Sequence, residues 1–301
     1  MPSFTIVPRG PFSLAAARDF AGGFAAGIGA RGHGAGILMA FPVEGWQGSA
    51  AVDAWQAEDG TVQAEVSGNG DMATVERQAA RSLSLDHDGG GWPDVGRRDP
   101  AIGALQERFG FLRPVCFYSA YEAATSFVIG QRIAMRQARV VKERLAAAWG
   151  DEIRIEGQVV RPFPRPHALV ELEGVQGLSS SKVDRLRAIA RAALDGRLDT
   201  ERLRSLPEAD ALAELRALPG IGGWTAQAVL LRGCGVADGL PLGDNISRGA
   251  VQWFHKLPQP PDDASWERIA EPWRPYRMWA TVLQHMAWRR DQPAPPSYRQ
   301  G

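Results

Sequence analysis

Cysteine is scarce in this 301-residue sequence, and the scarcity excludes several classes of protein. The two cysteines, Cys116 and Cys234, lie in apolar stretches, which favours buried free thiols. Two thiols are too few to hold an iron–sulfur cluster or a structural zinc ion. No cluster of His, Asp and Glu in the sequence indicates a transition-metal site. We therefore expect no required cofactor.

Long apolar runs are also missing, and no stretch is apolar for long enough to span a bilayer. The first residues lack the charged leader and apolar core of a signal peptide. We therefore expect a cytoplasmic protein, or one associated with the nucleoid of a bacterium, that has no membrane partner.

Net charge is absent as well, because 34 Lys and Arg balance 34 Asp and Glu. Proteins that bind nucleic acid usually carry a basic surface, so neutrality argues mildly against that partner. Residues 1–100 nevertheless contain about five more acidic than basic residues, and the remainder has the opposite excess. This asymmetry fits a basic working face on a neutral whole, and fits ordinary solvated faces equally well.

What the sequence does contain is an ordinary globular composition, with 45% hydrophobic and 23% charged residues. Its length allows two domains. Residues 1–100 predict an N-terminal α/β domain, an antiparallel sheet with helices on one face. The expected strands are 4–7, 37–41, 50–57 and 61–66, and the expected helices are 12–26 and 71–85. The glycines at 89–91 are read as linker, because no Lys-Ser or Lys-Thr follows them.

Residues 101–290 predict a mostly helical core, so the expected fold class is α+β. The longest helical run, 121–148, contains a break near Gly130 and Gln131. Further helices are expected at 182–195, 211–217, 224–232, 246–254, 264–270 and 276–289. Residues 291–301 form a Pro-rich tail that we expect to be frayed.

The stretch 215–250 organises the rest of the chain. Pro219 ends one helix, because its ring and missing N–H forbid continuation. The glycines of the turn at 219–223 allow a backbone path that side chains would block, and let another molecule approach closely. The helix expected over 224–232 starts directly after them, so its free N–H groups form a ready anion site. A loop then leads to Asp244, which would cap the next helix.

This stretch resembles the helix-hairpin-helix-Gly/Pro-Asp superfamily of DNA glycosylases. The residues that carry the resemblance are Leu218, Pro219, Gly220, Ile221, Gly222, Trp224, Thr225, Ala226 and Asp244. From about Tyr121 to Arg289 the order of segments is similar to the bacterial inducible 3-methyladenine DNA glycosylase II, the AlkA type. Its markers here are Gln131, Lys182, the hairpin with Asp244 and the segment 273–277.

The resemblance implies a helical core of two lobes with the active site between them. It implies a monomer that binds double-stranded DNA and excises damaged bases in base excision repair, by base flipping. Alkylated purines such as 3-methyladenine and 7-methylguanine would be the substrates. A cationic leaving base needs no general acid, so one carboxylate suffices to stabilise the developing sugar cation. Asp244 is the candidate by family spacing, and Asp238 is the rival.

The resemblance also assigns expected binding roles. The expected DNA contacts are Pro219, Gly220, Ile221, Gly222, Gly223, Thr225, Gln131, Arg132 and Lys182, and the expected base pocket is Trp224, Trp279, Tyr276 and His285. Arg132 stands at the position of the residue that fills the vacated base stack, although it could equally contact phosphate. His285 replaces an aromatic wall of the AlkA type, which leaves the lesion range open.

Two further implications concern chemistry at the hairpin. Family members that also nick the strand use a lysine there, and the corresponding residue is Trp224. We therefore expect no lyase activity. Backbone carbonyls of Leu218, Gly220 and Ile221 are candidates for holding a structural Na⁺ or K⁺. Two alternatives stay open: a non-catalytic helix-hairpin-helix protein that binds damaged DNA, and a glycosylase of this fold for oxidised or deaminated purines.

Overall fold

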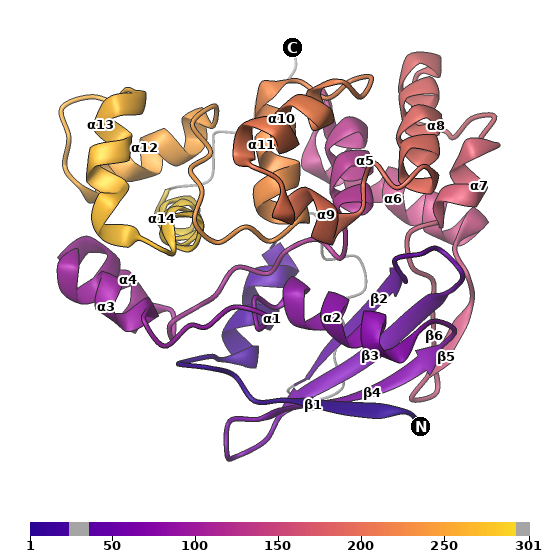
Figure 1. The fold of residues 1–301 in the computed structure, drawn as a ribbon, viewed down its shortest axis with the longest axis horizontal. Helices are drawn as coiled ribbons and strands as arrows, with labels where there is room; N and C mark the ends of the chain where they lie inside the picture. Colours follow the sequence, from indigo (N-terminus) through magenta and orange to yellow (C-terminus); the bar gives the residue numbers. More distant parts are fainter. Residues whose placement is uncertain (24–35, 293–301) are drawn as a thin grey trace, which may run out of the picture.

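A computed structural model of the protein describes residues 1–23 and 36–292. The end of the helix expected over 12–26 and the Pro-rich tail from residue 293 lie outside the described residues. The predicted α+β class is confirmed, since a small antiparallel sheet lies beside a larger group of helices (Figure 1). Within the described ranges, no helix is long and apolar enough to cross a membrane.

The sheet has four antiparallel strands, as expected for the first hundred residues. They are β1 (Ser3–Ile6), β2 (Ile37–Pro42), β3 (Ser49–Gln56) and β4 (Val62–Gly68), in the order β1-β4-β3-β2. Alternation of buried and half-buried residues along β4 reflects one face on the core and one nearer to solvent. Two helices, α1 (Leu14–Gly23) and α2 (Met72–Ser82), pack on the buried face.

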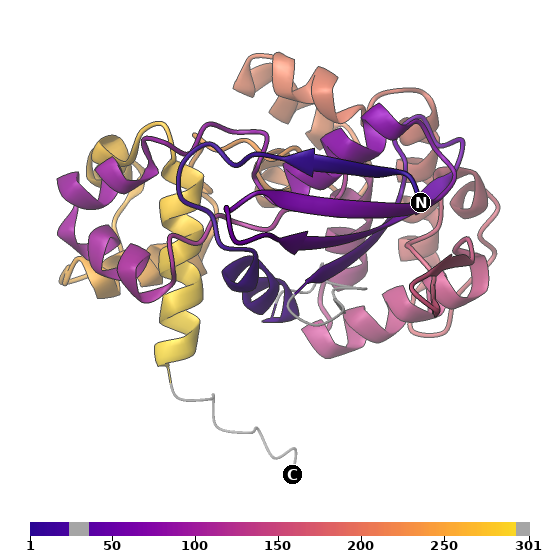
Figure 2. The same cartoon turned by 90° about the horizontal axis from the view of Figure 1, so that it is seen from below.

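A short hairpin that we did not predict covers part of the other face of the sheet. It consists of β5 (Ile153–Ile155) and β6 (Gln158–Val160). Ile153 and Ile155 share a small apolar cluster with Leu38 and Ala40 of β2 and Ala51 of β3. Every residue of β2 is buried. Figure 2 shows the four main strands side by side, with α14 (Arg277–Asp291) beyond one end of them.

The first group of helices, here called the middle lobe, has its own apolar core. Its elements are α5 (Ala120–Gly130), α6 (Met135–Trp149), α7 (Pro166–Val170), α8 (Ser180–Leu194), α9 (Thr200–Ser205), α10 (Glu208–Arg216), α11 (Gly223–Ala228) and a π-helical turn, η1 (Val229–Gly233). The break expected near Gly130 and Gln131 is confirmed, because α5 ends at Gly130 and α6 starts after a four-residue loop. Cys234 is buried in this core.

The second group, here called the terminal lobe, combines helices from both ends of the helical region. It contains α3 (Trp92–Arg98), α4 (Pro100–Arg108), α12 (Asn245–Phe254), α13 (Asp263–Ala270), the short η2 (Glu271–Trp273) and α14. Figure 1 shows α3 and α4 below α12–α14, and they share one buried core with α14 and with the sheet. The division of the chain near residue 100 stays a prediction.

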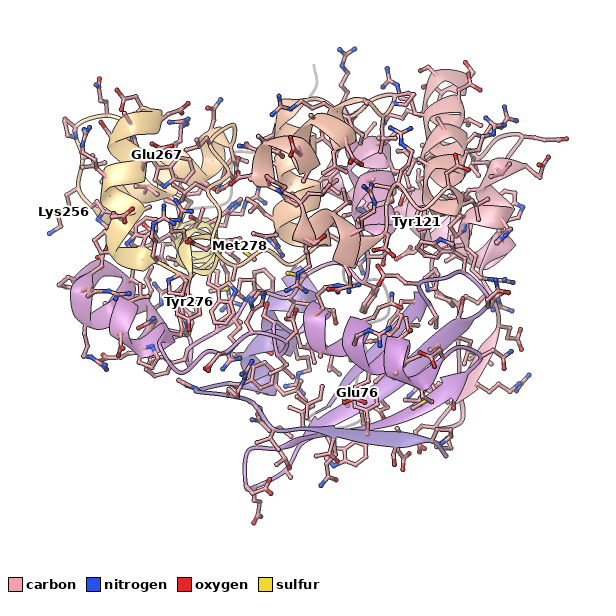
Figure 3. All side chains as sticks on the ribbon, in the orientation of Figure 1. Glu76, Tyr121, Lys256, Glu267, Tyr276 and Met278 are labelled. Carbon is pink, nitrogen blue, oxygen red and sulfur yellow. The ribbon has the colours of Figure 1, made fainter. Side chains whose placement is uncertain are left out.

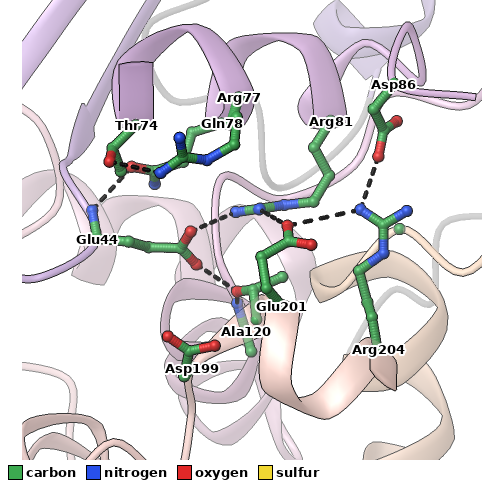
Figure 4. A network of polar contacts seen from close by, with 12 residues as sticks. Glu44, Thr74, Arg77, Gln78, Arg81, Asp86, Ala120, Asp199, Glu201 and Arg204 are labelled. Carbon is green, nitrogen blue, oxygen red and sulfur yellow. Dashed lines mark hydrogen bonds and ion pairs between the residues drawn. The ribbon is translucent and has the colours of Figure 1, made fainter. Parts of the chain in front are cut away.

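Buried polar contacts tie the sheet to the middle lobe (Figure 4). The guanidinium of Arg81 is 1% exposed and donates to Glu44 and Glu201, each at 2.8 Å. Burial raises the pKa of Glu44, which also accepts a hydrogen bond from the Thr200 hydroxyl. A buried charge is tolerated only when paired, so these residues fix α9 against α2 and the β2–β3 turn. Trp46 of that turn adds a bond from its indole N–H to the carbonyl of Ala193, at 3.1 Å.

Candidate active site

The hairpin predicted from the sequence joins α10 to α11. The amide of Ile221 donates to the carbonyl of Leu218 at 3.1 Å and closes the turn. Gly220 has a φ of +84°, and a Cβ there would lie 2.6 Å from the side chain of Arg185. Both facts require glycine at this position. Leu218 and Ile221 are buried and anchor the turn in the middle lobe.

The start of α11 is open on its outer side. Gly222 is the N-cap residue and offers no side chain to the first-turn amides. A Cβ added at Gly222 or Gly223 would meet no other atom within 4 Å. Thr225 is buried, so this residue can offer an incoming group only its backbone amide. The exposed N–H groups and the positive end of the helix suit an anion such as a phosphate.

Two side chains predicted to contact DNA, Gln131 and Lys182, form a clamp on the loop between α5 and α6. Gln131 donates from Nε2 to the carbonyl of Gly220 at 2.7 Å, and its Oε1 accepts from Arg185 at 3.0 Å. The ammonium of Lys182 donates to the carbonyls of Ile129 and Gln131 at 2.7 and 2.6 Å. Partial burial and the charge of Arg185 lower the pKa of Lys182. The amide of Gln131 therefore holds the loop to the hairpin, and the ammonium of Lys182 holds the same loop to α8.

Arg132 follows Gln131 on the loop that this clamp holds. It is exposed and has a φ of +56°, a conformation that costs a residue with a side chain of the order of 1–3 kcal/mol. Gln131, the residue before Arg132, is held by its hydrogen bond to Gly220 and by the bond from Lys182 to its carbonyl. These two bonds offset that cost. An extended cation on a fixed, exposed loop can either enter a base stack or meet a phosphate.

Asp244 caps the N-terminus of α12. Its Oδ1 accepts from the amide of Ile246 at 3.1 Å, and its Oδ2 accepts from the hydroxyl of Ser247 at 2.6 Å. The preceding Gly243 donates its amide to Gln227 of α11 at 3.2 Å. This bond brings the loop that carries Asp244 onto the helix that carries Trp224. The side chain of Asp244 is 16% exposed.

The rival carboxylate, Asp238, is already neutralised. Its two oxygens accept from Arg274 at 2.7 Å and from Arg277 at 2.6 Å. Two guanidinium partners leave little negative charge for a developing cation. Asp244 has no Arg or Lys partner within salt-bridge distance in residues 1–23 and 36–292. The structure thus favours Asp244 over Asp238 as the reactive acid.

Trp224 presents an aromatic surface next to Asp244. The side chain of Trp224 is 45% exposed. A Cβ added at Gly243, the residue before Asp244, would lie 3.5 Å from the Cβ of Trp224. The ring of Phe127 meets it edge-on at 5.4 Å and supports it from the middle lobe. An indole that is supported on one side and open on another can stack with a planar ligand.

Two of the expected pocket residues, Trp279 and Tyr276, are packed in the apolar core. Trp279 is fully buried, and its ring lies 5.7 Å from Trp92 and 4.7 Å from Tyr276. Tyr276 is also buried, and its hydroxyl donates to the carbonyl of Asp88 at 2.6 Å. Figure 3 shows Tyr276 at the base of α14, above α3 and α4. Each residue turns a helix by 100°, so the face of α14 that carries Trp279 packs inward while another face meets Asp244.

His285 lies on that other face of α14. Its Nδ1 is 3.3 Å from Oγ of Ser247 and 3.8 Å from Oδ2 of Asp244. Burial lowers the pKa of His285 to about 4, against the opposing attraction of Asp244, and the charges of Arg289 and Arg232 lower it further. The imidazole is therefore neutral at neutral pH. Of the four expected pocket residues, His285 lies beside Asp244, and Trp224 lies against the loop that carries Asp244.

Three residues that contact this site were not predicted from the sequence, namely Ser247, Gln227 and Arg185. Ser247 stands three residues after the capping Asp244, where a polar side chain often completes a helix cap, and this spacing could have revealed it. Gln227 and Arg185 gave no such signal, because their partners lie 16 and 54 residues away in the chain.

The turn also offers carbonyl oxygens. Those of Leu218 and Gly220 accept one hydrogen bond each, from Ile221 and Gln131. A carbonyl has a second lone pair, so these groups, together with that of Ile221, fit a monovalent cation. In the described part of the chain, no three His, Cys, Asp or Glu side chains gather as metal ligands.

The known proteins that are similar to this chain include two sequence relatives and a solved structure of the same fold. A DNA-3-methyladenine glycosylase of Bacillus subtilis is 26% identical over 203 residues, which are 66% of this chain and 67% of that protein. A probable bifunctional transcriptional activator/DNA repair enzyme AlkA of Mycobacterium tuberculosis is 27% identical over 224 residues, 72% of this chain but 42% of that longer protein. No protein-family model matches the chain.

The 3-methyladenine DNA glycosylase of Archaeoglobus fulgidus is a solved structure with a TM-score of 0.76 and 22% identity. The alignment covers 96% of this chain and 98% of that one. The similarity therefore includes the N-terminal sheet as well as the helices. The resemblance to the helix-hairpin-helix glycosylases of AlkA type is confirmed.

Proposed function

We propose that this protein is a monofunctional DNA glycosylase, which hydrolyses the N-glycosidic bond of alkylated purines and leaves an abasic site. The observation that carries the proposal is the pairing of Asp244 with the exposed Trp224 beside the open hairpin. The similarity to 3-methyladenine glycosylases supports the same reaction. DNA is then the partner, the protein acts as a monomer, and in a bacterium it works at the nucleoid.

In this proposal the hairpin holds the DNA backbone. The open amides after Gly222 bind a phosphate, while the clamp of Gln131 keeps Arg132 in place. Flipping a base out of a duplex costs a few kcal/mol, and a lesion that is already weakly paired lowers this cost. Arg132 either fills the vacated position or holds the neighbouring phosphate.

Trp224 and Asp244 then divide the recognition of the flipped nucleotide. A cationic base stacked on the indole gains roughly 0.5–2 kcal/mol from cation–π attraction. N-alkylated purines carry that charge, whereas undamaged purines do not. The carboxylate of Asp244 stabilises the positive sugar as the bond breaks, and the cationic base leaves without a general acid.

Lysine usage supports the absence of lyase activity. The chain has lysine only at positions 142, 182 and 256. Lys142 is buried against Glu122, and Lys182 is held by two carbonyls. Lys256 lies beyond the C-terminus of α12, about 15 Å along the helix from Asp244. None of these three amines is positioned to attack a sugar at Asp244.

The test is release of free base from N-methylated duplex DNA by wild type and by Asp244→Asn, with strand breaks scored before and after alkali. We expect wild type to release 3-methyladenine and 7-methylguanine, with breaks only after alkali. We expect the variant to bind the same DNA without turnover. Salt-dependent binding with no release by either protein would favour a non-catalytic damage-binding protein. Release of only oxidised or deaminated bases would favour the other branch of the fold.

A further inference from the structure

Asp244, Ser247 and His285 form a chain of polar contacts that reaches from α12 to α14. The Ser247 hydroxyl donates to Oδ2 of Asp244 at 2.6 Å. Its oxygen lies 3.3 Å from Nδ1 of His285. Ser247 is 2% exposed, so the chain is held inside the terminal lobe at its centre.

The arrangement fixes the tautomer of His285. A carboxylate only accepts hydrogen bonds, so the one proton of the Ser247 hydroxyl is used on Asp244. Nδ1 must then carry a hydrogen and donate to Ser247, because two lone pairs would otherwise face each other. The other ring nitrogen, Nε2, consequently carries no hydrogen and has a free lone pair.

That lone pair is available to solvent or ligand. The imidazole is 29% exposed, and no residue in the ranges 1–23 and 36–292 binds Nε2. Three charged groups face the ring, namely Asp244 from α12, Arg289 from α14 and Arg232 from η1. With burial, the two guanidinium groups outweigh the carboxylate and lower the pKa of His285 to about 4. The acceptor form therefore persists at neutral pH.

The two oxygens of Asp244 are both engaged in the folded protein. One accepts from the Ile246 amide and the other from the Ser247 hydroxyl. These contacts hold the carboxylate in position beside a sugar cation, and leave the removal of a proton from water to another group.

Resting on the function proposed above, we propose that His285 is a second catalytic residue, the base that receives the proton of the attacking water at Nε2. The C1′–N bond breaks first, and the leaving base takes its electron pair. The water oxygen then bonds to C1′ and passes a proton to Nε2, while Asp244 stays ionised throughout. The resulting imidazolium beside Asp244 returns its proton to solvent.

The test compares single-turnover base release by wild type, His285→Asn and His167→Asn on the same N-methylated duplex. The Asn amide can replace Nδ1 as the donor to Ser247 but has no basic nitrogen at Nε2. His167 is exposed on α7 and serves as the matched control. We expect a rate about a hundredfold lower for His285→Asn, at the low end for a general base because this transition state is dissociative. We expect no change for His167→Asn.

Thermal melting confirms that each variant is folded. A second variant, His285→Ala, leaves room for a free base, so added imidazole should restore most of its lost rate without affecting wild type. A wild-type rate for His285→Asn, or a slow folded His285→Ala that imidazole does not restore, would overturn the role of His285 as a base while the glycosylase assignment stands. If wild type itself releases no base from any lesion, the proposed function fails and the inference fails with it.

Discussion

The two sides of the candidate site carry different chemical groups. The middle-lobe side consists of backbone amides, the loop of Arg132 and the indole of Trp224. The terminal-lobe side carries Asp244, Ser247 and His285 in one hydrogen-bonded chain. Under the function proposed above, the middle lobe binds and positions the nucleotide, while the terminal lobe supplies the negative charge and the proton acceptor.

The sharpest way to separate the two sides is to remove the carboxylate. Asp244→Asn should lower single-turnover base release by about a thousandfold, as for other groups that stabilise transition-state charge, and should leave DNA affinity nearly unchanged. Asp238→Asn is the matched control, since its carboxylate serves only Arg274 and Arg277. Equal losses in both variants, measured by chromatography of the freed base, would refute the assignment of Asp244.

The terminal-lobe side should also respond to pH through His285. A histidine whose folded pKa is depressed to about 4 supports stability that is fully present above its unfolded value, about 6.5, and is lost as pH falls through 4. Wild type should therefore lose roughly 1–3 kcal/mol more unfolding free energy than His285→Asn between pH 7 and pH 4. Urea denaturation at both pH values measures this. Identical losses in the two proteins would contradict a buried neutral imidazole.

The middle-lobe side should affect binding more than bond breaking. Trp224→Ala removes the stacking surface, which is worth roughly 1–3 kcal/mol for each base, so the preference for lesion over undamaged DNA should fall by at least about fivefold. Trp149→Ala removes an indole of similar exposure, 39%, from the end of α6 and serves as control. An unchanged preference in competition binding would mean that the base does not rest on Trp224.

The smallest effect should come from the exposed loop. Arg132→Ala should weaken DNA binding by about threefold, because a single exposed charge contributes little. A phosphate contact would also reduce the slope of log affinity against log salt by about one, whereas insertion into the stack would leave that slope unchanged. Arg154→Ala, with a side chain 79% exposed on β5, gives the background for any arginine loss. No effect on affinity, rate or slope would exclude Arg132 from both roles.

The hairpin and Asp244 could be predicted because their determinants are local. Pro219 and Gly220 dictate the turn by their own backbone preferences, and Asp244 caps the helix that directly follows it. The same reasoning predicted the strands and the break after Gly130, since both depend on short patterns. Each of these features is decided by residues that are close together in the sequence.

The side of the site that α14 forms could not be predicted in the same way. Trp279, Tyr276 and His285 share one helix, and the rotation of α14 against α3, α4 and α12 decides which of them faces Asp244. The sequence shows only that all three side chains end in a ring that can line a pocket. Likewise, DNA contacts were predicted at Lys182 and Gln131, but their hydrogen bonds to the loop and the hairpin reach across 51 and 89 residues of the chain and could not be predicted.

The sequence by itself determined the helix-hairpin-helix, the place of the candidate carboxylate Asp244 and the absence of a lysine beside it in the chain, because each depends on neighbours in the chain. Only the tertiary structure decided that Trp279 and Tyr276 belong to the core, that Asp238 is neutralised, and that Ser247 joins Asp244 to His285. These outcomes depend on how whole helices pack, and packing is set by the summed burial of many residues rather than by any single motif.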